Sequence, residues 1–347
     1  MKKILSLFFI TILLLSSCGE DKSGDTPEQK IELSAEAKAD LLARAKQIFG
    51  ALPDKMPGSE NDTPELVELG KTLYFETRLS VNNTQSCNTC HDITNGKAGD
   101  DNLRVSPGAI EGKEGVRNSP TVLNAGFQFV QFWDGREPDL HGQAKGPILN
   151  PDEMAMPSEK ECETLLSGIP EYQEMFGKAF PGVKNAITYD NLAHAIAAFE
   201  RTLISKSRFD DYVNGNPTAL TNAELNGLKT FIDVGCITCH TGPLFGGSMY
   251  QKMGLIKPYA NVKDLGRYDV TKNDLDKYFF KVAQLRNVTL TAPYYHDGAV
   301  ESLDEAINTM ADINLGKQLT ADETKSIKTF LQALTDKNLE KGIAIKF

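Results

Sequence analysis

Two copies of a short motif, Cys-x-x-Cys-His, are the residues of this 347-residue sequence best suited to chemistry. The first copy is Cys87-Asn-Thr-Cys90-His91 and the second is Cys236-Ile-Thr-Cys239-His240. The pattern attaches a c-type haem, because two thiols add to the vinyl groups and the adjacent imidazole binds the iron. A structural zinc site needs four ligands close together, and a redox-active disulfide does not need the histidine. The sequence therefore predicts two covalently bound haem c groups, with His91 and His240 as iron ligands.

A helix is predicted shortly before each motif, where it can position the cysteines. Thr63-Pro64-Glu65 is typical of a helix N-terminus, and Thr221 to Glu224 forms a capping box. Both predicted helices contain a glycine followed closely by Lys-Thr, at Gly70 and at Gly227. Because a helix followed by the haem motif occurs twice, the sequence indicates a duplicated cytochrome unit.

The rest of the chain is predicted to be helices joined by long loops. Apolar spacing or capping predicts further helices at residues 35–49, 191–204, 303–310 and from 320 onward. Loops rich in Gly and Pro span 95–126 and 242–274, and no sustained alternation of polar and apolar residues suggests a large sheet. The predicted fold class is all-α, with two cytochrome c-like domains and little or no sheet.

The N-terminus is typical of an export signal. Lys2 and Lys3 precede an apolar run of 12 residues, too short to span a bilayer, and Leu-Ser-Ser-Cys18 follows. Cys18 stands where a bacterial lipobox has its lipidated cysteine; ordinary cleavage that leaves Cys18 as a spare thiol is the alternative. The expected location is the periplasmic side or the cell surface, with membrane contact only through the lipid.

The domain prediction follows from these segments. We expect a lipoprotein signal peptide at 1–17, a flexible polar tether at 18–30, a first haem domain at 31–200 and a second at 201–347. Whether the C-terminal segment packs back on the first domain is left open.

The chain is acidic, with a formal net charge of −10 that becomes −12 when Lys2 and Lys3 are removed with the signal. Negative charge disfavours nucleic acid as a partner and favours basic proteins at the encounter stage. The alternative is that the acidity only keeps an exported protein soluble.

Several stretches, in this order, resemble the bacterial di-haem cytochrome c peroxidase family over nearly the whole mature chain. They are residues 117–124, 131–136, 143–148, 198–203, 285–288 and 290–298. The resemblance implies a peroxidatic haem in the first half and an electron-entry haem in the second. It also implies reduction of hydrogen peroxide to water with electrons from a small donor such as cytochrome c or a copper protein. A homodimer is left open.

The resemblance further implies metal ligands outside the two motifs. Met310 occupies the place of the second axial ligand of the electron-entry haem, and a thioether opposite an imidazole raises the reduction potential. Methionine here argues against the relatives that oxidise tryptophans in a partner protein, which have tyrosine. A calcium site is implied from the side chain of Asn118 and the backbone carbonyls of Thr291 and Pro293, since Ca²⁺ prefers oxygen ligands.

The sequence departs from the family pattern in the loop at 106–112. Many relatives have there a histidine that binds the peroxidatic iron until the enzyme is reduced, but this loop contains none. We therefore predict that the first haem is open or water-bound even when fully oxidised. Relatives also often have a tryptophan between the haems, for which the sequence suggests no clear counterpart; Trp133 is predicted to lie in the distal loop.

A second departure concerns the distal acid–base group. After Trp-Asp-Gly-Arg the family usually has a glutamate near a glutamine matched here by Gln131, but this chain has His141. A histidine can move a proton between the peroxide oxygens because its pKa is near neutrality. We predict Gln131 and His141 as catalytic residues; His141 as a sixth iron ligand or as a surface residue are the alternatives.

Two other functions stay open from the sequence alone. A tethered di-haem cytochrome could transfer electrons with little peroxidase activity, and both irons would then be six-coordinate. A di-haem oxidase could act on an organic or protein substrate, although Met310 argues against it.

Overall fold

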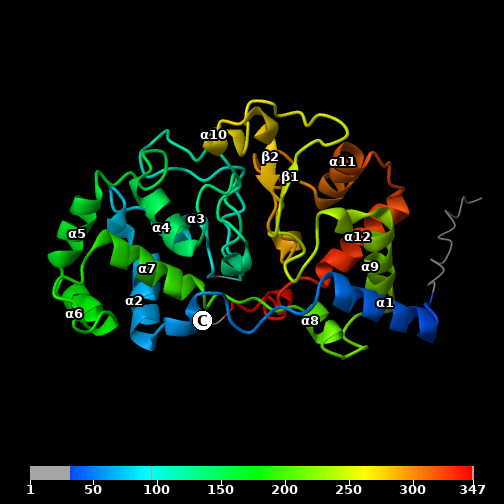
Figure 1. Cartoon of the computed structure of the whole chain (residues 1–347), viewed down its shortest axis with the longest axis horizontal. Coiled ribbons are helices and arrows are strands. Elements are labelled where there is room, and N and C mark those ends of the chain that lie inside the picture. The colour runs from blue at the N-terminus through cyan, green and yellow to red at the C-terminus, as the bar shows by residue number, and fades with distance from the viewer. Residues whose placement is uncertain (1–31, 95, 346–347) are drawn as a thin grey trace, which may run out of the picture. The chain divides into compact units, whose positions relative to one another are not determined.

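The computed structural model describes residues 32–94 and 96–345. The predicted signal peptide, the predicted lipidation site Cys18 and the predicted tether lie outside these residues. The described chain is mostly helical, which confirms the all-α class (Figure 1). Its strands within these ranges are β1 (Tyr250–Lys252) and β2 (Phe279–Lys281), an antiparallel pair in which Tyr250 faces Lys281. None of the helices in the described ranges has the length and apolar character needed to cross a bilayer.

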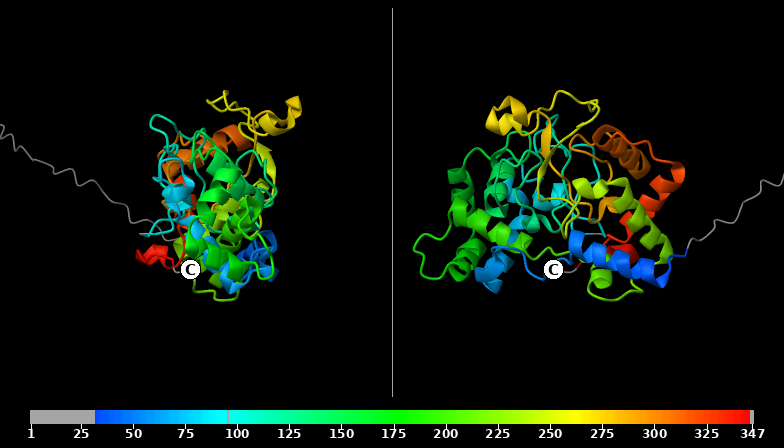
Figure 2. Two further views of the ribbon diagram at one scale, coloured as in Figure 1. Left: turned by 90° about the vertical axis from the view of Figure 1, so that its left-hand side faces the viewer. Right: turned by 45° about the vertical axis from the view of Figure 1, so that its right-hand side comes forward.

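The helices have the following bounds. The α-helices are α1 (Ala35–Ile48), α2 (Pro64–Tyr74), α3 (Cys87–Cys90), α4 (Leu140–Leu149), α5 (Glu159–Ser167), α6 (Pro170–Ala179), α7 (Tyr189–Glu200), α8 (Arg208–Val213), α9 (Asn222–Val234), α10 (Tyr268–Thr271), α11 (Leu303–Leu315) and α12 (Ala321–Gln332). Short 3₁₀ helices lie at Ser59–Asn61, Thr77–Leu79, Ala125–Phe127, Cys236–Thr238, Asp274–Asp276, Val288–Leu290 and Leu339–Lys341. Figure 2 shows the segment around α10 projecting away from the other helices.

The predicted helix starts are confirmed at atomic detail. The Thr63 hydroxyl accepts a hydrogen bond from the Leu66 amide at 3.2 Å, with Pro64 at the first helical position. Thr221 and Glu224 form the reciprocal capping box, since the Thr221 amide donates to the Glu224 carboxylate at 2.8 Å. The predicted helix at 303–310 is longer than expected, because α11 continues to Leu315 and ends at Gly316 in the left-handed conformation.

The same helix crossing is built twice. α2 packs against α7, and a Cβ added at Gly70 would lie 1.8 Å from the Ala195 carbonyl oxygen. α9 packs against α12, and a Cβ added at Gly227 would lie 2.1 Å from the Ser326 carbonyl oxygen. Each glycine therefore brings two helix backbones into contact, in agreement with the predicted duplication.

The packing of α1 differs from the predicted domain boundary. Leu41, Ala45 and Phe49 belong to the core of the second half, where the Phe49 ring stacks on Phe245 at 4.1 Å. Figure 1 shows α1 beneath α9 and α12, although the sequence placed residues 35–49 in the first domain. The apolar stripe of a helix does not specify which core covers it, so sequence proximity was a poor guide. At the other end of the chain, Leu339 packs into a core cluster of the first half.

Candidate haem and peroxide sites

The cysteines of each haem motif lie in a short helical turn. In the first, α3 itself is Cys87–Cys90, and Ser86 and Thr89 cap it reciprocally. In the second, α9 ends at Gly235 with φ +100°, and the 3₁₀ turn of Cys236 begins at once. A residue with a side chain adopts this φ only with strain, so glycine sets the direction in which the cysteines leave the helix.

The two proximal histidines are oriented in the same way. His91 Nδ1 lies 3.0 Å from the carbonyl oxygen of Pro120, and His240 Nδ1 lies 2.9 Å from that of Phe245. A carbonyl can only accept a hydrogen bond, so Nδ1 carries the proton and Nε2 is left with a lone pair for iron. Burial lowers the pKa of both imidazoles, which favours the neutral form that binds a metal.

One cavity gathers the residues predicted for the second haem. Cys236, Cys239, His240 and Met310 all line it, and Met310 belongs to α11. A second thioether, that of Met253, also borders the cavity. The remaining wall near the motif is apolar and includes Phe231, Leu303, Ile307, Leu315, Leu319 and Leu331. Thiols, an imidazole, a thioether and an apolar wall are what a c-type haem with His and Met ligands requires, so these residues fit the group.

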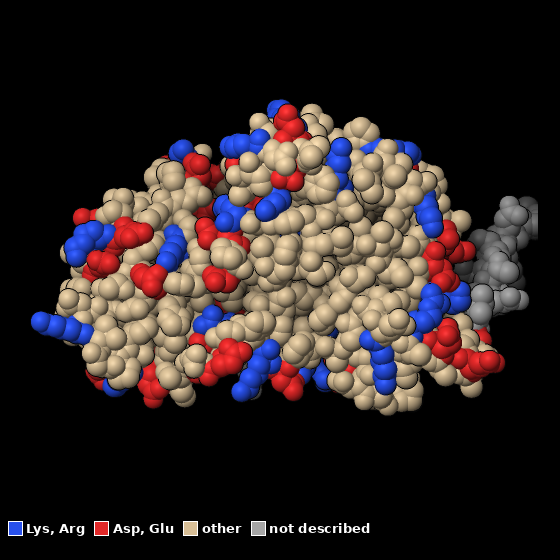
Figure 3. All heavy atoms as spheres, viewed as in Figure 1, with Lys and Arg blue, Asp and Glu red and all other residues tan. Residues whose placement is uncertain are grey.

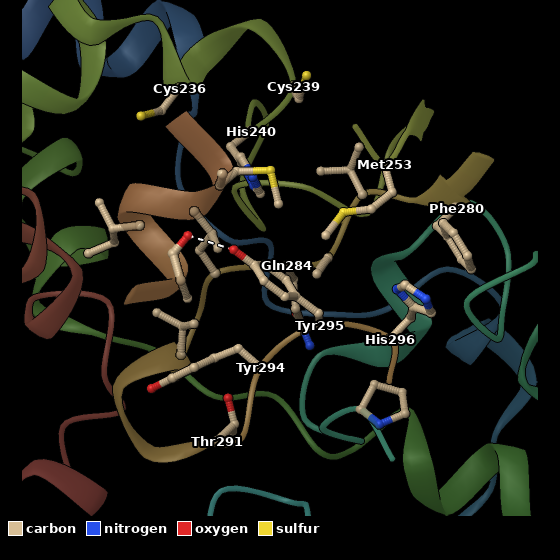
Figure 4. A pocket seen from close by; sticks show the side chains of 18 of the residues that line it. Cys236, Cys239, His240, Met253, Phe280, Gln284, Thr291, Tyr294, Tyr295 and His296 are labelled. Atoms are coloured by element: carbon tan, nitrogen blue, oxygen red, sulfur yellow. Dashed lines mark hydrogen bonds between the residues drawn. The ribbon is translucent and has the colours of Figure 1, made fainter. Parts of the chain in front are cut away.

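Away from the cysteines the cavity wall is polar and incompletely hydrogen-bonded. Figure 4 shows Cys236, Cys239 and His240 at one end and Thr291, Tyr294 and His296 toward the other. Asp100 Oδ1, Gln284 Oε1 and His296 Nε2 are buried without a protein hydrogen-bond partner, and all three residues line the cavity. Because an unsatisfied buried polar atom costs free energy, this wall fits a polar ligand such as the propionates of a haem or a cation.

The residues predicted to bind calcium lie on this same wall. Asn118, Thr291 and Pro293 all line the cavity. Asn118 Nδ2 donates to the Leu103 carbonyl at 2.9 Å, which turns the amide group into a fixed orientation. The donor set contains only oxygens, and the Asp100 carboxylate, whose Oδ1 has no hydrogen-bond partner, lines the same cavity, so the chemistry suits Ca²⁺.

Trp133 contacts both halves of the chain, a position that the sequence did not suggest for it. It follows α3 in the first half, yet it lines the cavity of the second haem motif. Its indole Nε1 donates to the Asn118 carbonyl at 2.9 Å, and its own carbonyl accepts from the Lys281 amide of β2 at 2.8 Å. The sequence could not reveal this because the contact depends on β2, about 150 residues later.

The loop at 106–112 lies against the residues that precede the first motif. Gln85 Nε2 donates to the Pro107 carbonyl at 2.6 Å, and Asn82 donates to the Ala109 carbonyl. The Ala109 amide in turn donates to the carbonyl of Glu153 at 2.7 Å. The loop and Glu153 are thereby held beside α3.

Glu153 is the functional candidate that the sequence reasoning missed. Burial raises the pKa of its carboxyl, which is tied by a 2.9 Å hydrogen bond from Asn150. Burial also raises the pKa of the Cys90 thiol to about 11, and the negative charges of Asp101 and Glu153 raise it further. Glu153 is thus close enough to the first motif to act on its charge. Its only signal in the sequence is a lone glutamate in the Asn-Pro-Asp-Glu-Met stretch after the helix at 140–149.

His141, which the sequence predicted to be the distal acid–base group, lies at the surface of the first half. Its Nε2 is 3.1 Å from Asp190 Oδ1, and its ring centroid is 5.9 Å from that of His194. Among the contacts recorded for the described residues, none joins it to His91. This placement favours the surface alternative. Leu140, the first residue of α4, is buried, and the His141 side chain, about 100° further around the helix axis, is 35% exposed.

Gln131 is buried in a structural hydrogen bond. Its side chain is 5% exposed, and its Nε2 donates to the Ala125 carbonyl at 3.0 Å. Its amide donates to the Glu137 carbonyl at 2.8 Å, so both ends of the residue hold the loop before α4 in shape. These contacts favour a structural role.

Comparison with known proteins agrees with this geometry. The family model described as di-haem cytochrome c peroxidase matches residues 64–218. Cytochrome c551 peroxidase of Pseudomonas aeruginosa is 45% identical over 313 residues, which cover 87% of this chain and 88% of that protein. The protein of the same name from Nitrosomonas europaea is 45% identical over 278 residues, which cover 79% and 81%. The crystal structure of a MauG-like protein associated with microbial copper homeostasis aligns with a TM-score of 0.72 at 27% identity, over 83% of this chain and 95% of that one. The chain therefore belongs to the di-haem cytochrome c peroxidase family, whose members are haem-dependent oxidoreductases that act on peroxide.

Proposed function

We propose that this protein reduces hydrogen peroxide to water at the His91 site with electrons that a small donor protein delivers at the His240 site. The observation that supports this division is the inequality of the two sites. His240 shares its cavity with the thioether of Met310, whereas the charged neighbours of Cys90 are the carboxylates of Asp101 and Glu153. The haems, when bound, supply the redox-active iron.

Glu153 is proposed as the acid–base group at the first site. Cleavage of the O–O bond needs a group that takes a proton from one oxygen and returns it to the other. A carboxyl whose pKa is raised by burial is better matched to this exchange near neutral pH than an ordinary, fully ionised glutamate. The loop at 106–112, which has no histidine, leaves Glu153 without competition from a ligand of that loop.

Met310 is proposed as the second ligand of the electron-entry iron, and Trp133 as the connection between the sites. A thioether favours the reduced iron and so the uptake of electrons from a cytochrome or copper protein. Trp133 belongs to the first half and borders the cavity of the second, which supports a path through its ring.

The setting of the reaction is also a proposal. We infer an exported protein held at the periplasmic side or the cell surface by a lipid on Cys18, with Ca²⁺ bound by Asn118, Thr291 and Pro293. Figure 3 shows Lys and Arg interspersed with Asp and Glu on the face drawn, instead of a field of one sign. That pattern supports the reading of the acidity as a contribution to solubility.

The test is a spectroscopic and kinetic comparison of the resting holoprotein with the half-reduced one. Optical and EPR spectra of the fully oxidised protein are expected to show a high-spin first haem, and peroxide is expected to turn over without prior reduction of the second. A low-spin bis-histidine spectrum from the first haem would contradict the open site. Absence of any spectral change on adding peroxide would instead support the electron-transfer alternative.

A further inference from the structure

Asp100 is a buried carboxylate that the proposed reaction does not use. Its side chain is 2% exposed, and Oδ1 has no hydrogen-bond partner in the protein. Burial raises its pKa to about 7, with a further contribution from the charge of Asp101. Lys97 lies near enough to oppose this, but its ammonium group donates to the Asp101 carbonyl at 3.0 Å. The carboxylate is therefore only weakly compensated by the groups around it.

Hydrogen bonds of Asn102 join the segment around Asp100 to the segment that carries the proposed calcium carbonyls. Asn102, two residues later, donates from Nδ2 to the Leu290 carbonyl at 2.8 Å and to the Ala292 carbonyl at 3.0 Å. The charge of Asp100 also reaches Tyr294, where it helps to raise the pKa of the phenol. The segment at 100–103 and the segment at 290–294 thus lie side by side at the cavity wall.

Three residues that can supply neutral oxygens line the same cavity. Asn118 uses Nδ2 to hold the Leu103 carbonyl, which leaves Oδ1 for another partner. The hydrogen bonds that join the described residues leave the carbonyls of Thr291 and Pro293 without a donor. Asp100, Asn118, Thr291 and Pro293 all line the one cavity.

Charge decides what this set of oxygens can bind. An amide and two carbonyls carry no net charge, whereas protein sites for Ca²⁺ gain much of their affinity from carboxylates. We propose that Asp100 supplies the negative charge of the calcium site, as a direct ligand or through a bound water, so that one cation is held by segments of both halves. This inference rests on the calcium binding proposed above.

The experiment measures calcium affinity directly on the full-length holoprotein. The protein is stripped with EGTA and titrated with CaCl₂ by calorimetry, with MgCl₂ in a parallel titration. Asp100→Asn keeps the shape of the side chain and removes its charge, and Asp100→Ser provides a second, smaller replacement. Either variant is expected to bind Ca²⁺ about 10- to 100-fold more weakly, and to gain less in melting temperature when Ca²⁺ is added.

Glu200→Gln is the matched control. Glu200 is also buried with an unpartnered carboxylate oxygen, but it is not among the residues that line the cavity. The same acid-to-amide change there should leave calcium affinity at the wild-type value. Wild-type affinity in Asp100→Asn, an equal loss in Glu200→Gln, or a wild-type protein that binds no Ca²⁺ would each overturn the inference. Peroxide turnover of the wild-type protein is assayed separately. A wild-type protein that binds Ca²⁺ but does not turn over peroxide overturns only the proposed function.

Discussion

The two haem motifs have the same local construction, but the charged residues around them differ. In both, the imidazole Nδ1 faces a backbone carbonyl and a glycine lets two helices cross nearby. Near the first motif, burial and the negative charge of Glu200 raise the pKa of Cys87. The negative charges of Asp101 and Glu153 likewise raise the pKa of Cys90, in addition to the effect of burial. Near the second, burial raises the pKa of Cys236 while the cation of Lys317 lowers it.

The different charges favour different oxidation states of the two haem irons. Carboxylates favour the oxidised iron, whereas a nearby cation and a thioether ligand favour the reduced iron. The parts that hold a haem are alike in the two halves, whereas the charged side chains around them differ, as the proposed division into peroxide reduction and electron uptake requires.

The largest expected effect is at the acid–base group of the first site. Glu153→Gln removes the proton carrier and should lower kcat/KM for peroxide by about 10²- to 10⁴-fold, with haem content unchanged. Stopped-flow turnover with a reduced donor measures the rate, and the pyridine haemochrome spectrum measures the haem.

His141→Ala is the companion variant for this measurement. Because His141 is engaged with Asp190 on the surface, its loss should leave kcat/KM close to wild type. If His141→Ala is the slow variant and Glu153→Gln is not, the first site has been assigned to the wrong residue.

Met310→Leu should remove the feature that most distinguishes the second site. Loss of the thioether is expected to lower the reduction potential of the second haem and to slow electron entry, as followed by spectroelectrochemical titration. Met253→Leu is the control, because Met253 lines the same cavity without being the proposed ligand. Should Met253→Leu shift the potential and Met310→Leu leave it unchanged, the ligand assignment is reversed.

The glycines at the two helix crossings test how far the halves share one construction. Gly70→Ala and Gly227→Ala should each destabilise the protein by about 1–3 kcal/mol or more, since the new methyl group meets a backbone carbonyl. Gly177→Ala in α6, where the added Cβ meets nothing within 4 Å, should instead be neutral or stabilising. Urea unfolding of the three variants provides the comparison, and an effect at only one crossing would show that the halves pack differently.

The last prediction concerns the pH dependence of stability. Burial raises the pKa of Glu200 to about 8, above the value of about 4.3 for an unfolded glutamate. Between these two values the folded protein keeps a proton that the unfolded chain has lost, so the free energy of unfolding falls as pH rises, by up to about 1.4 kcal/mol per pH unit.

Glu200→Gln removes this contribution. The free energy of unfolding of Glu200→Gln minus that of the wild type should therefore increase as pH rises from about 5 to about 8. Urea unfolding of both proteins across this range gives the difference directly. A constant difference would mean that Glu200 ionises normally in the folded protein.

The sequence by itself determined the features that are written within a few residues. The attachment of two haems needs only five consecutive positions, and the helix starts at Thr63, Thr221 and Thr320 need only one turn. The all-α class follows from apolar spacing in the same local way. The family resemblance extended these inferences to Met310, which the structure brings to the cavity of His240.

Only the tertiary structure decided which distant segments meet. The apolar stripe of α1 is the same whichever core covers it, and the structure packs it into the second half. The sequence pointed to His141 as the proton carrier, but in the structure His141 lies 3.1 Å from Asp190, whereas Glu153, which the sequence did not single out, lies close enough to Cys90 to affect its pKa. The proposed roles of Trp133 and Asp100 depend on residues far along the chain, since Trp133 accepts a hydrogen bond from Lys281 and the charge of Asp100 reaches Tyr294. Side-chain environments depend on burial and on long-range contacts, and local sequence encodes neither.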